Sequence, residues 1–244
     1  MPDQGIEISF VIPCHNEAEN LRPLMAMVHE AMTDLGKSFE VIITDDGSTD
    51  GSWEVLKTTA RTDRRLRVQR FRSRCGQSAA SWAGIEAARG IYIVTIDADL
   101  QNDLKDLPKF MEALKVYDCV CGTRVATRHE GDSSLRIIAS RFANWFRNKV
   151  LSDDFSDSAC SFRAFKRECV SRIQFFHGAH RFLPALFKMA GFTVTEVGIQ
   201  NRTRVAGKSH YGIGNRSLTA FIDLIGVWWV KKRMLRYEIT EKMP

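Results

Sequence analysis

The sequence predicts an α/β fold with a mainly parallel sheet flanked by helices. Short apolar runs rich in β-branched residues alternate with stretches of helical spacing through the first half of the chain, which is the pattern of βαβ units. The 244 residues are enough for one large domain and few for two independent ones. No internal repeat, low-complexity tract or clear linker divides the chain. We therefore expect one domain over residues 1–215, followed by an amphipathic helix and tail over residues 216–244.

The first half divides into alternating strands and helices. The predicted strands are Ile6–Pro13, Glu40–Thr44, Leu66–Phe71, Ile91–Ile96 and a short strand around Val120. The predicted helices are Glu19–Leu35, Ser52–Ala60, Gln77–Ala88 and Leu104–Val116. In the first of these helices, Leu21, Leu24 and Val28 recur at the spacing of one helix face. Gly36 then provides a C-terminal stop.

The second half is less regular. The predicted helices are Leu135–Leu151, Arg181–Ala190 and Ser217–Val230. The predicted strands are Cys160–Phe165 and Thr193–Ile199, and Asn201–Gly214 is a basic, glycine-containing loop. The first of these helices is amphipathic, because arginines alternate with bulky apolar residues along it.

Composition and charge narrow the class of protein. Hydrophobic residues make up 44% and charged residues 26%, as in ordinary globular proteins. The six cysteines form no CxxC pair and no zinc-type spacing, so we expect free thiols in a reducing compartment. No leader of basic and then apolar residues and no run of about 18 apolar residues is evident. These features predict a body in the cytoplasm.

The net charge of +6 favours an anionic partner. Charge alone leaves a nucleotide sugar, an acidic lipid and a nucleic acid open. Seven arginines lie between Arg61 and Arg74 and form the densest basic stretch. The alternative interpretation is that these arginines are solvent-exposed, at the end of a helix and on an edge strand.

Polar clusters follow three of the predicted strands. They are His15–Glu17, Asp45–Ser48 and Asp97–Gln101. In an open parallel sheet, ligands bind beyond the carboxyl ends of the strands. The three clusters therefore predict one site at one edge of the sheet.

Asp97 and Asp99 are the centre of the predicted site. Two carboxylates one residue apart, just past an apolar strand, can both direct oxygens to one ion, and hard oxygen ligands suit Mg²⁺ or Mn²⁺. An isolated Asp-x-Asp is also compatible with a solvated turn, but the position beside two other polar strand ends argues against that alternative. Turn formation and helix capping by Ser48 or Asp50 are compatible with a functional role for their segment.

Several segments together resemble a known family. They are PCHNEAENL, DDGSTDGS, GQSAASWAGIEAARG, DADLQ, GTR, SDSACSFRAF, HRFLPAL and RVAGKSHYG. In this order, over about residues 8–215, they resemble the family 2 glycosyltransferases, and most of all the polyprenol-phosphate branch typified by dolichol-phosphate mannose synthase. The resemblance implies a GT-A type, Rossmann-like fold and a GDP- or UDP-linked sugar donor.

The resemblance also implies the residues of the donor site. Those expected at the nucleotide sugar are Pro13, His15, Glu17, Thr44, Asp46, Ala98, Arg204, Lys208 and His210, together with the metal-binding residues Asp97, Asp99 and Gln101. The family often has Tyr where His15 stands and Lys where His210 stands. A neutral imidazole attracts phosphate less than an ammonium group, so Lys208 is expected to substitute for the second of these.

Three further positions match the family at the acceptor. Arg124, Arg136 and Ser140 are expected at the acceptor phosphate. Asp157 is a candidate for a general base or for orienting the acceptor, and, with Asp99 and Arg124, is expected to be catalytic. A phosphate monoester has a second pKa of about 6 and needs little deprotonation, which favours orientation. The alternative is a structural carboxylate that caps a helix or pairs with Arg163.

The implied reaction is a single displacement, with inversion, that moves the sugar onto a polyprenyl phosphate. Such an acceptor lies in a bilayer, and Ser217–Val230, about 21 Å long as a helix, is too short to span a core of about 30 Å. Trp228, Trp229 and the basic residues after them predict peripheral attachment to the cytoplasmic face of the membrane. The alternative is a helix packed on the domain or on a second copy in a homo-oligomer. Asp223 argues against a spanning segment.

Two other functions remain to be compared with this one. The same chemistry could act on a hydroxyl acceptor, which would require a true base. A non-enzymatic basic module that binds lipid or nucleic acid would explain the arginine run, but not Asp97, Asp99 and Gln101, because carboxylates repel phosphate in the absence of a metal. We therefore expect no nucleic acid partner.

Overall fold

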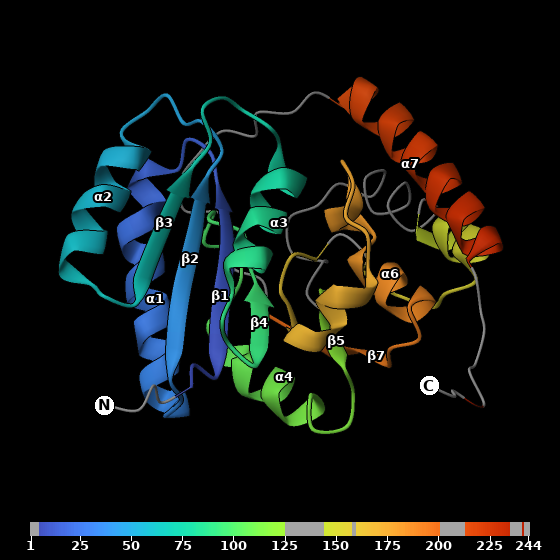
Figure 1. The fold of residues 1–244 in the computed structure, drawn as a ribbon, viewed down its shortest axis with the longest axis horizontal. Helices are drawn as coiled ribbons and strands as arrows, with labels where there is room; N and C mark the ends of the chain where they lie inside the picture. The colour runs from blue at the N-terminus through green and yellow to red at the C-terminus, as the bar shows by residue number, and fades with distance from the viewer. Residues whose placement is uncertain (1–4, 125–143, 158–159, 201–212, 235–240, 242–244) are drawn as a thin grey trace.

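The computed structural model describes residues 5–124, 144–157, 160–200, 213–234 and 241. One sheet lies between two layers of helices (Figure 1). Within the described residues its seven strands are β1 (Ile8–Cys14), β2 (Phe39–Asp45), β3 (Leu66–Arg70), β4 (Tyr92–Thr95), β5 (Cys119–Thr123), β6 (Arg163–Lys166) and β7 (Val194–Gly198). The described helices are α1 (Ala18–Leu35), α2 (Ser52–Thr62), α3 (Gln77–Ala87), α4 (Leu107–Ala113), α6 (Leu183–Met189) and α7 (Ile213–Arg233), and residues 144–151 are also helical. The predicted α/β class is confirmed.

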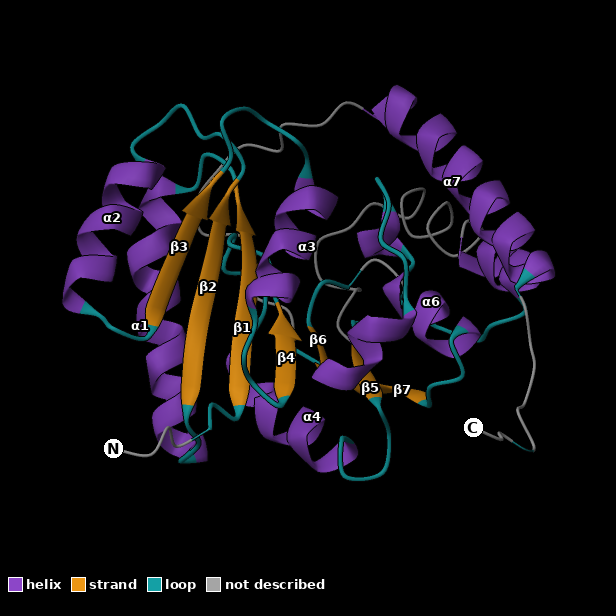
Figure 2. Ribbon diagram, viewed as in Figure 1, coloured by secondary structure: helices purple, strands orange, loops and turns teal. Residues whose placement is uncertain are grey.

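The strands follow the order β3-β2-β1-β4-β6-β5-β7. β1 pairs in parallel with β2 and β4, β2 with β3, and β5 with β7. β6 is antiparallel to both of its neighbours, β4 and β5. The carboxyl ends of β1, β2, β4 and β5 therefore lie at one edge of the sheet, and β6 begins at that edge. We call it the carboxyl edge; Figure 2 shows the arrowheads of β1, β2 and β3 ending there.

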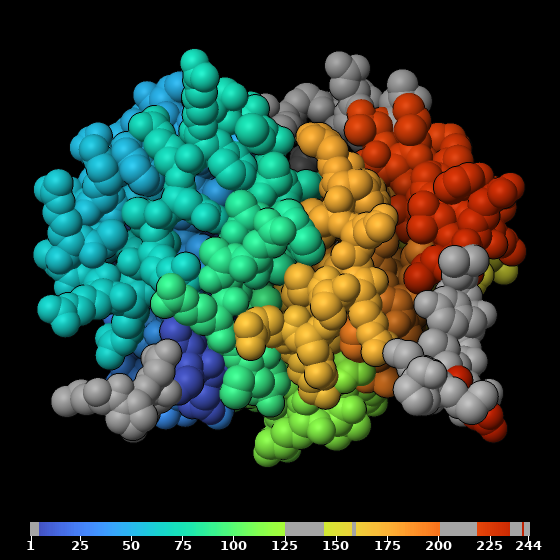
Figure 3. All heavy atoms as spheres, in the orientation of Figure 1, coloured from blue at the N-terminus to red at the C-terminus, as the bar shows by residue number. Residues whose placement is uncertain are grey.

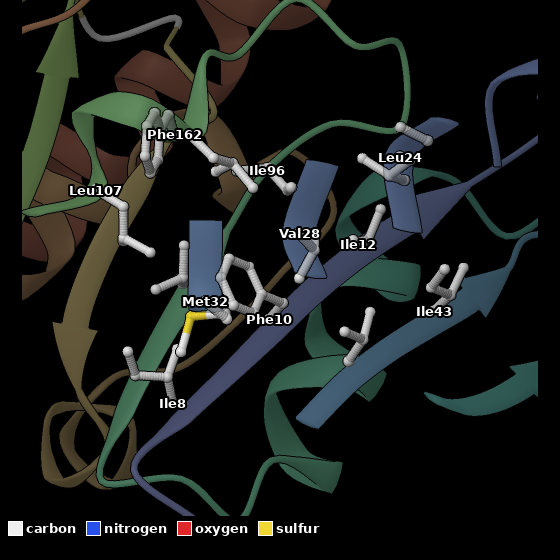
Figure 4. Close-up of a cluster of buried hydrophobic side chains, with 14 of the residues drawn as sticks. Ile8, Phe10, Ile12, Leu24, Val28, Met32, Ile43, Ile96, Leu107 and Phe162 are labelled. Atoms are coloured by element: carbon white, nitrogen blue, oxygen red, sulfur yellow. The ribbon is translucent and has the colours of Figure 1, made fainter. Parts of the chain in front are cut away.

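The core lies on both faces of the sheet because side chains alternate along each strand. Ile8, Phe10 and Ile12 of β1 are fully buried on the face covered by α1 and α4, and Figure 4 shows them against Leu24 and Val28 of α1. Val11 lies on the other face, in a second buried cluster with residues of α3 and α6. The strand β1 is thus a central strand with no solvent face, which explains its continuous apolar sequence.

Some predicted elements begin later in the structure. Residues 104–106 form a 3-10 turn, in which the Asp103 carboxylate caps the amide of Lys105, before α4 begins at Leu107. Residues 179–181 form another 3-10 turn before α6. β6 begins at Arg163, three residues after the predicted start of its strand. Turn chemistry, which periodicity does not detect, accounts for the first of these shifts.

The C-terminal helix α7 lies against the body of the protein on the far side of α6 from α4 (Figure 1). Leu224 and Val227 are buried in the second cluster. Asp223, the charge within this apolar helix, faces Arg181 at 3.5 Å and is 15% exposed. None of the helices in the described residues has the length and apolarity needed to cross a membrane. The predicted boundary near residue 215 stays a prediction.

Candidate functional site

The loops after β1 and β2 are joined at the carboxyl edge. The Nδ1 atom of His15 lies 2.8 Å from the carbonyl oxygen of Asp46. Because a carbonyl only accepts, this contact assigns the proton to Nδ1. The side-chain oxygen of Asn16 accepts a hydrogen bond from the backbone amide of Thr49 at 2.8 Å. The backbone amide of Asn16 donates one to the Ser48 hydroxyl at 2.9 Å. The two polar clusters predicted to converge therefore form one surface.

Asp46 ties a third loop to this surface. Its carboxylate accepts hydrogen bonds from the backbone amides of Cys75, at 2.5 Å, and Gly76, at 2.9 Å. These amides immediately precede α3. The carboxylate is buried, and its hydrogen bonds fix the position of the α3 N-terminus relative to β2.

The other residues expected at the nucleoside lie beside these. Pro13 is next to Thr44 in the parallel register of β1 and β2. The Thr44 hydroxyl is buried and accepts a hydrogen bond from the Gln69 amide at 2.7 Å. Glu17 accepts a hydrogen bond from Asn20 at 2.6 Å. The structure thus brings together the five positions expected at the nucleoside.

Asp97 and Asp99 follow β4 at the same edge. Oδ1 of Asp97 accepts a hydrogen bond from the Gln77 side chain at 2.9 Å, and Oδ1 of Asp99 accepts one from the backbone amide of Gln101 at 3.2 Å. Leu100 has a left-handed φ of +63°, a conformation uncommon for such a side chain. This turn places the backbone amide of Gln101 against the Asp99 carboxylate, while Ala98 between the two aspartates is buried.

The electrostatics of the pair fit a divalent cation. Burial, and after it the neighbouring Asp99 carboxylate, raise the pKa of Asp97. A desolvated carboxylate with a second carboxylate beside it is stabilised by a cation with a preference for oxygen ligands. No third acidic, histidine or cysteine side chain completes a metal-binding group with them among the described residues. The remaining ligands would then come from Gln101, water and substrate phosphate.

Arg124 and Asp157 form a second charged group, beyond the end of β5. The Arg124 guanidinium donates to the Asp157 carboxylate from Nε at 2.7 Å and from Nη2 at 3.1 Å, and the Arg124 backbone amide donates at 3.2 Å. The side chain of Asp157 is 1% exposed and that of Arg124 is 21% exposed. Burial is the largest single influence and acts to lower the pKa of Arg124, but the hydrogen bonds and charge of Asp157, with the charge of Asp97 and other neighbours, together raise it. Arg124 is thus a permanent cation whose side chain is partly exposed.

Five predicted site residues lie outside the described residues. They are Arg136, Ser140, Arg204, Lys208 and His210. Their expected roles stay predictions.

Sequence reasoning missed Gln77 and the pairing of two arginines with carboxylates of β2. Gln77 contacts Asp97, and Asp45, fully buried, pairs with Arg70 at 3.0 Å. Arg67 likewise pairs with buried Glu40 at 2.8 Å. Part of the arginine run therefore binds carboxylates of β2. Pairing of β3 with β2 would have indicated the ion pair of Asp45 with Arg70, because these two residues are partners in the register of the two strands.

Comparison with known proteins identifies the family. The profile described as Glycosyl transferase family 2 matches residues 9–174. A dodecaprenyl-phosphate galacturonate synthase of Rhizobium johnstonii is 33% identical over 96% of this chain and 70% of its own length. An undecaprenyl-phosphate 4-deoxy-4-formamido-L-arabinose transferase of Aeromonas hydrophila is 34% identical over 84% of this chain. The chain spans 63% of the length of the second relative.

Solved structures with the same fold are more distant in sequence. Glucosyl-3-phosphoglycerate synthase of Mycobacterium tuberculosis aligns with a TM-score of 0.65 at 18% identity, covering 93% of this chain and 80% of that one. A mannosyltransferase of Pyrobaculum calidifontis, in complex with GDP-mannose and Mn²⁺, aligns with a TM-score of 0.64 at 18% identity, covering 95% and 65%. These similarities confirm the predicted GT-A type fold. The chain belongs to glycosyl transferase family 2 and is a glycosyltransferase, as its motifs predict.

Proposed function

We propose that this protein transfers a sugar from a nucleoside diphosphate to a polyprenyl phosphate. The observation that carries the proposal is the similarity, over nearly the whole chain, to a relative named for a dodecaprenyl phosphate, together with a second named for an undecaprenyl phosphate. The arrangement of charges at the carboxyl edge supports it. A carboxylate pair and a separate arginine suit two phosphate-bearing substrates, one held through a metal and one held directly.

The donor site is formed by the loops after β1, β2 and β4. Pro13, His15, Glu17, Thr44 and Asp46 contact the nucleoside, and Ala98 lines the site. Asp97, Asp99 and Gln101 would hold Mg²⁺ or Mn²⁺, which would supply positive charge to neutralise the departing diphosphate. Support for a divalent metal comes from the neighbours crystallised with Mn²⁺ and UDP-glucose or GDP-mannose. We assign Arg204, Lys208 and His210 to binding of the diphosphate.

The acceptor site centres on Arg124. Its guanidinium is oriented by Asp157, and its side chain is 21% exposed, so we assign it to the acceptor phosphate. Arg136 and Ser140 contribute further contacts. An acceptor phosphate is largely dianionic near neutral pH, so Asp157 acts by orienting Arg124 and the acceptor. Attack in line with the departing diphosphate inverts the anomeric carbon.

A surface for the lipid lies on α7 and on the helix at residues 144–151, and we call it the apolar face. Figure 3 shows the C-terminal helix at the outside of the molecule. The exposed large apolar residues of this face are Trp145, Phe146, Phe221, Ile222, Ile225, Trp228, Trp229 and Val230. Phe146 and Phe221 stack at 6.1 Å, which joins the two helices. Tryptophans next to Lys231, Lys232 and Arg233 suit the interface of an anionic bilayer, so we propose peripheral attachment to the cytoplasmic face of a membrane.

The test is an assay of nucleotide release with GDP- and UDP-sugars, Mg²⁺ or Mn²⁺, and either undecaprenyl phosphate or undecaprenol in detergent. We expect turnover with the phosphate and none with the alcohol, and a product of inverted anomeric configuration by NMR. In Asp157→Asn, loss of orientation should reduce kcat/KM by about tenfold, whereas loss of a general base would reduce it by about 10²- to 10⁴-fold. Turnover with the alcohol alone would contradict the assignment of the acceptor.

A further inference from the structure

We propose that Glu196 is a positioning residue for the Asp157–Arg124 pair. This inference rests on the proposed function, because it gives the pair its role at the acceptor. Glu196 lies on β7, about forty residues after Asp157, and none of the sequence motifs above includes it. Its carboxylate holds the backbone that precedes and includes Asp157, and so fixes where the Asp157 side chain meets Arg124.

The Glu196 carboxylate binds three donors from two consecutive residues. Oε2 accepts hydrogen bonds from the Ser156 backbone amide at 2.9 Å and from the Ser156 hydroxyl at 2.8 Å. Oε1 accepts from the backbone amides of Ser156 at 3.0 Å and Asp157 at 3.2 Å. Hydrogen bonds to a charged acceptor are stronger than neutral ones. Both oxygens of the Glu196 carboxylate therefore hold the segment through hydrogen bonds.

The carbonyls of the same segment are held from the opposite side. The Asn144 side chain donates to the carbonyl oxygens of Phe155 at 2.9 Å and Ser156 at 2.6 Å. Asn148, one turn later on the same helix, donates to Phe155 at 2.8 Å. Glu196 of β7 thus binds the backbone amides of this segment, and the helix at residues 144–151 binds its backbone carbonyls. We call these contacts the backbone clamp.

The backbone clamp connects directly to Arg124. The Ser156 hydroxyl, which Glu196 binds, lies 2.7 Å from the hydroxyl of Thr123, and Thr123 precedes Arg124. Asp157 then closes the link with three hydrogen bonds to Arg124. A shift of the Ser156 peptide would therefore move both the carboxylate and the strand end that carries the guanidinium.

The chemistry of the clamp explains why the residue on β7 is a glutamate. Placing an anion close to the buried Asp157 carboxylate is unfavourable unless donors offset the repulsion. The amides of Ser156 and Asp157 supply them, and an apolar residue would leave those amides without this partner. The negative charge of Glu196 orients the backbone, and both oxygens of Asp157 accept hydrogen bonds from Arg124.

The experiment compares Glu196→Gln and Glu196→Ala with the surface control Glu112→Gln, whose side chain is 73% exposed. We expect kcat/KM for undecaprenyl phosphate to fall by at most about tenfold in Glu196→Ala, as in Asp157→Asn, with partial recovery in Glu196→Gln, which keeps one acceptor oxygen. The affinity for the nucleotide should be unchanged in both. In combination with Asp157→Ala, Glu196→Ala should add little further loss, because the two act through one contact. Multiplicative losses, or an equal loss of nucleotide affinity, would overturn the positioning role.

A second readout separates this inference from the proposed function. The Nε–H resonance of Arg124, assigned by its loss in Arg124→Lys, reports the hydrogen bond to Asp157 without any turnover. We expect it to move in Glu196→Gln and to stay in place in Glu112→Gln. A moved resonance in a protein that fails to glycosylate undecaprenyl phosphate would leave the clamp standing and the acceptor assignment wrong. A resonance unchanged in Glu196→Gln would overturn the clamp even if transfer is observed.

Discussion

The side-chain nitrogen of Gln77 donates a hydrogen bond to Oδ1 of Asp97 at 2.9 Å. Gln77 is the first residue of α3, and Asp97 follows β4. The contact therefore connects the N-terminus of α3 to the carboxylate proposed to bind the metal. It thus helps to orient this carboxylate.

Removing this hydrogen bond should weaken the metal site. Partners that orient a ligand typically contribute about 10- to 100-fold to metal affinity, so Gln77→Ala should raise the Mn²⁺ concentration needed for half-maximal donor binding by about tenfold. Titration of Mn²⁺ against UDP or GDP binding measures this. Glu86→Ala, an exposed position on the same helix, is the control. Unchanged Mn²⁺ dependence in Gln77→Ala would show that Asp97 is oriented without it.

Two glycines with nearly equal φ angles allow the cost of backbone strain to be compared with the cost of steric crowding. Gly36 and Gly47 have φ of +66° and +65°. A Cβ at Gly36 would meet nothing within 4 Å, whereas one at Gly47 would lie 2.8 Å from the backbone of Ser73 and Arg74. Gly36→Ala should cost about 1 kcal/mol from strain alone.

Gly47→Ala should cost at least about 1–3 kcal/mol more, because the loop before α3 must move. Since the neighbouring Asp46 holds that loop, donor affinity should also fall in Gly47→Ala and not in Gly36→Ala. Denaturant unfolding and nucleotide titration of the two variants check both statements. Equal free energies of unfolding for Gly36→Ala and Gly47→Ala would contradict the close approach of the Ser73 and Arg74 backbone to Gly47.

Asp118 predicts a defined dependence of stability on pH. The hydrogen bond from Lys166 at 2.8 Å, with others from Thr193, lowers the pKa of Asp118 to about 2. Because the folded pKa lies below the unfolded value, this stabilisation is present above the ordinary pKa near 4 and is lost as pH falls towards 2. Asp118→Asn should therefore lower the free energy of unfolding by about 1–2 kcal/mol at pH 7. The difference from wild type should shrink between pH 4 and 2 in urea unfolding; a constant difference would contradict the assigned cause.

The apolar face predicts binding to vesicles. Trp229 is 54% exposed, and Lys232 beyond it is also exposed. Trp229→Ser and Lys232→Glu should each weaken binding to phosphatidylglycerol vesicles, the second by about fivefold or more because one basic residue contributes about 1 kcal/mol. Sedimentation with vesicles measures this. Val116→Ser, at a 73% exposed position on another side of the fold, should bind as wild type does, and equal weakening in all three would argue against a specific face.

The sequence was sufficient to predict the alternating elements and the carboxyl edge. Both depend on short-range patterns, such as the apolar run of β1 and the polar residues that follow each strand. Asp97, Asp99 and His15 could be found in this way. Their place in the structure follows from the parallel pairing of β1 with β2 and β4.

The direction of β6 and the partner of Asp157 could not be predicted in this way. Arg163 was the structural partner considered for Asp157, whereas the structure pairs Asp157 with Arg124 at 2.7 Å. That pairing depends on β6 running antiparallel to β4 and β5, and antiparallel placement leaves no mark on the local pattern of a four-residue strand. Gln77 and Glu196 were missed for the same reason, since their partners lie twenty or more residues away.

The most direct test of the proposed reaction is the mass of the lipid product. Purified protein, undecaprenyl phosphate and the donor selected by the nucleotide-release assay should yield a lipid that carries one sugar on its phosphate. The account predicts this product with Mn²⁺ or Mg²⁺ and its loss in EDTA or in Asp99→Ala. Formation of the same product by Asp99→Ala in EDTA would contradict the proposed metal site, and absence of any glycosylated lipid phosphate from the wild type with every donor would contradict the proposed acceptor.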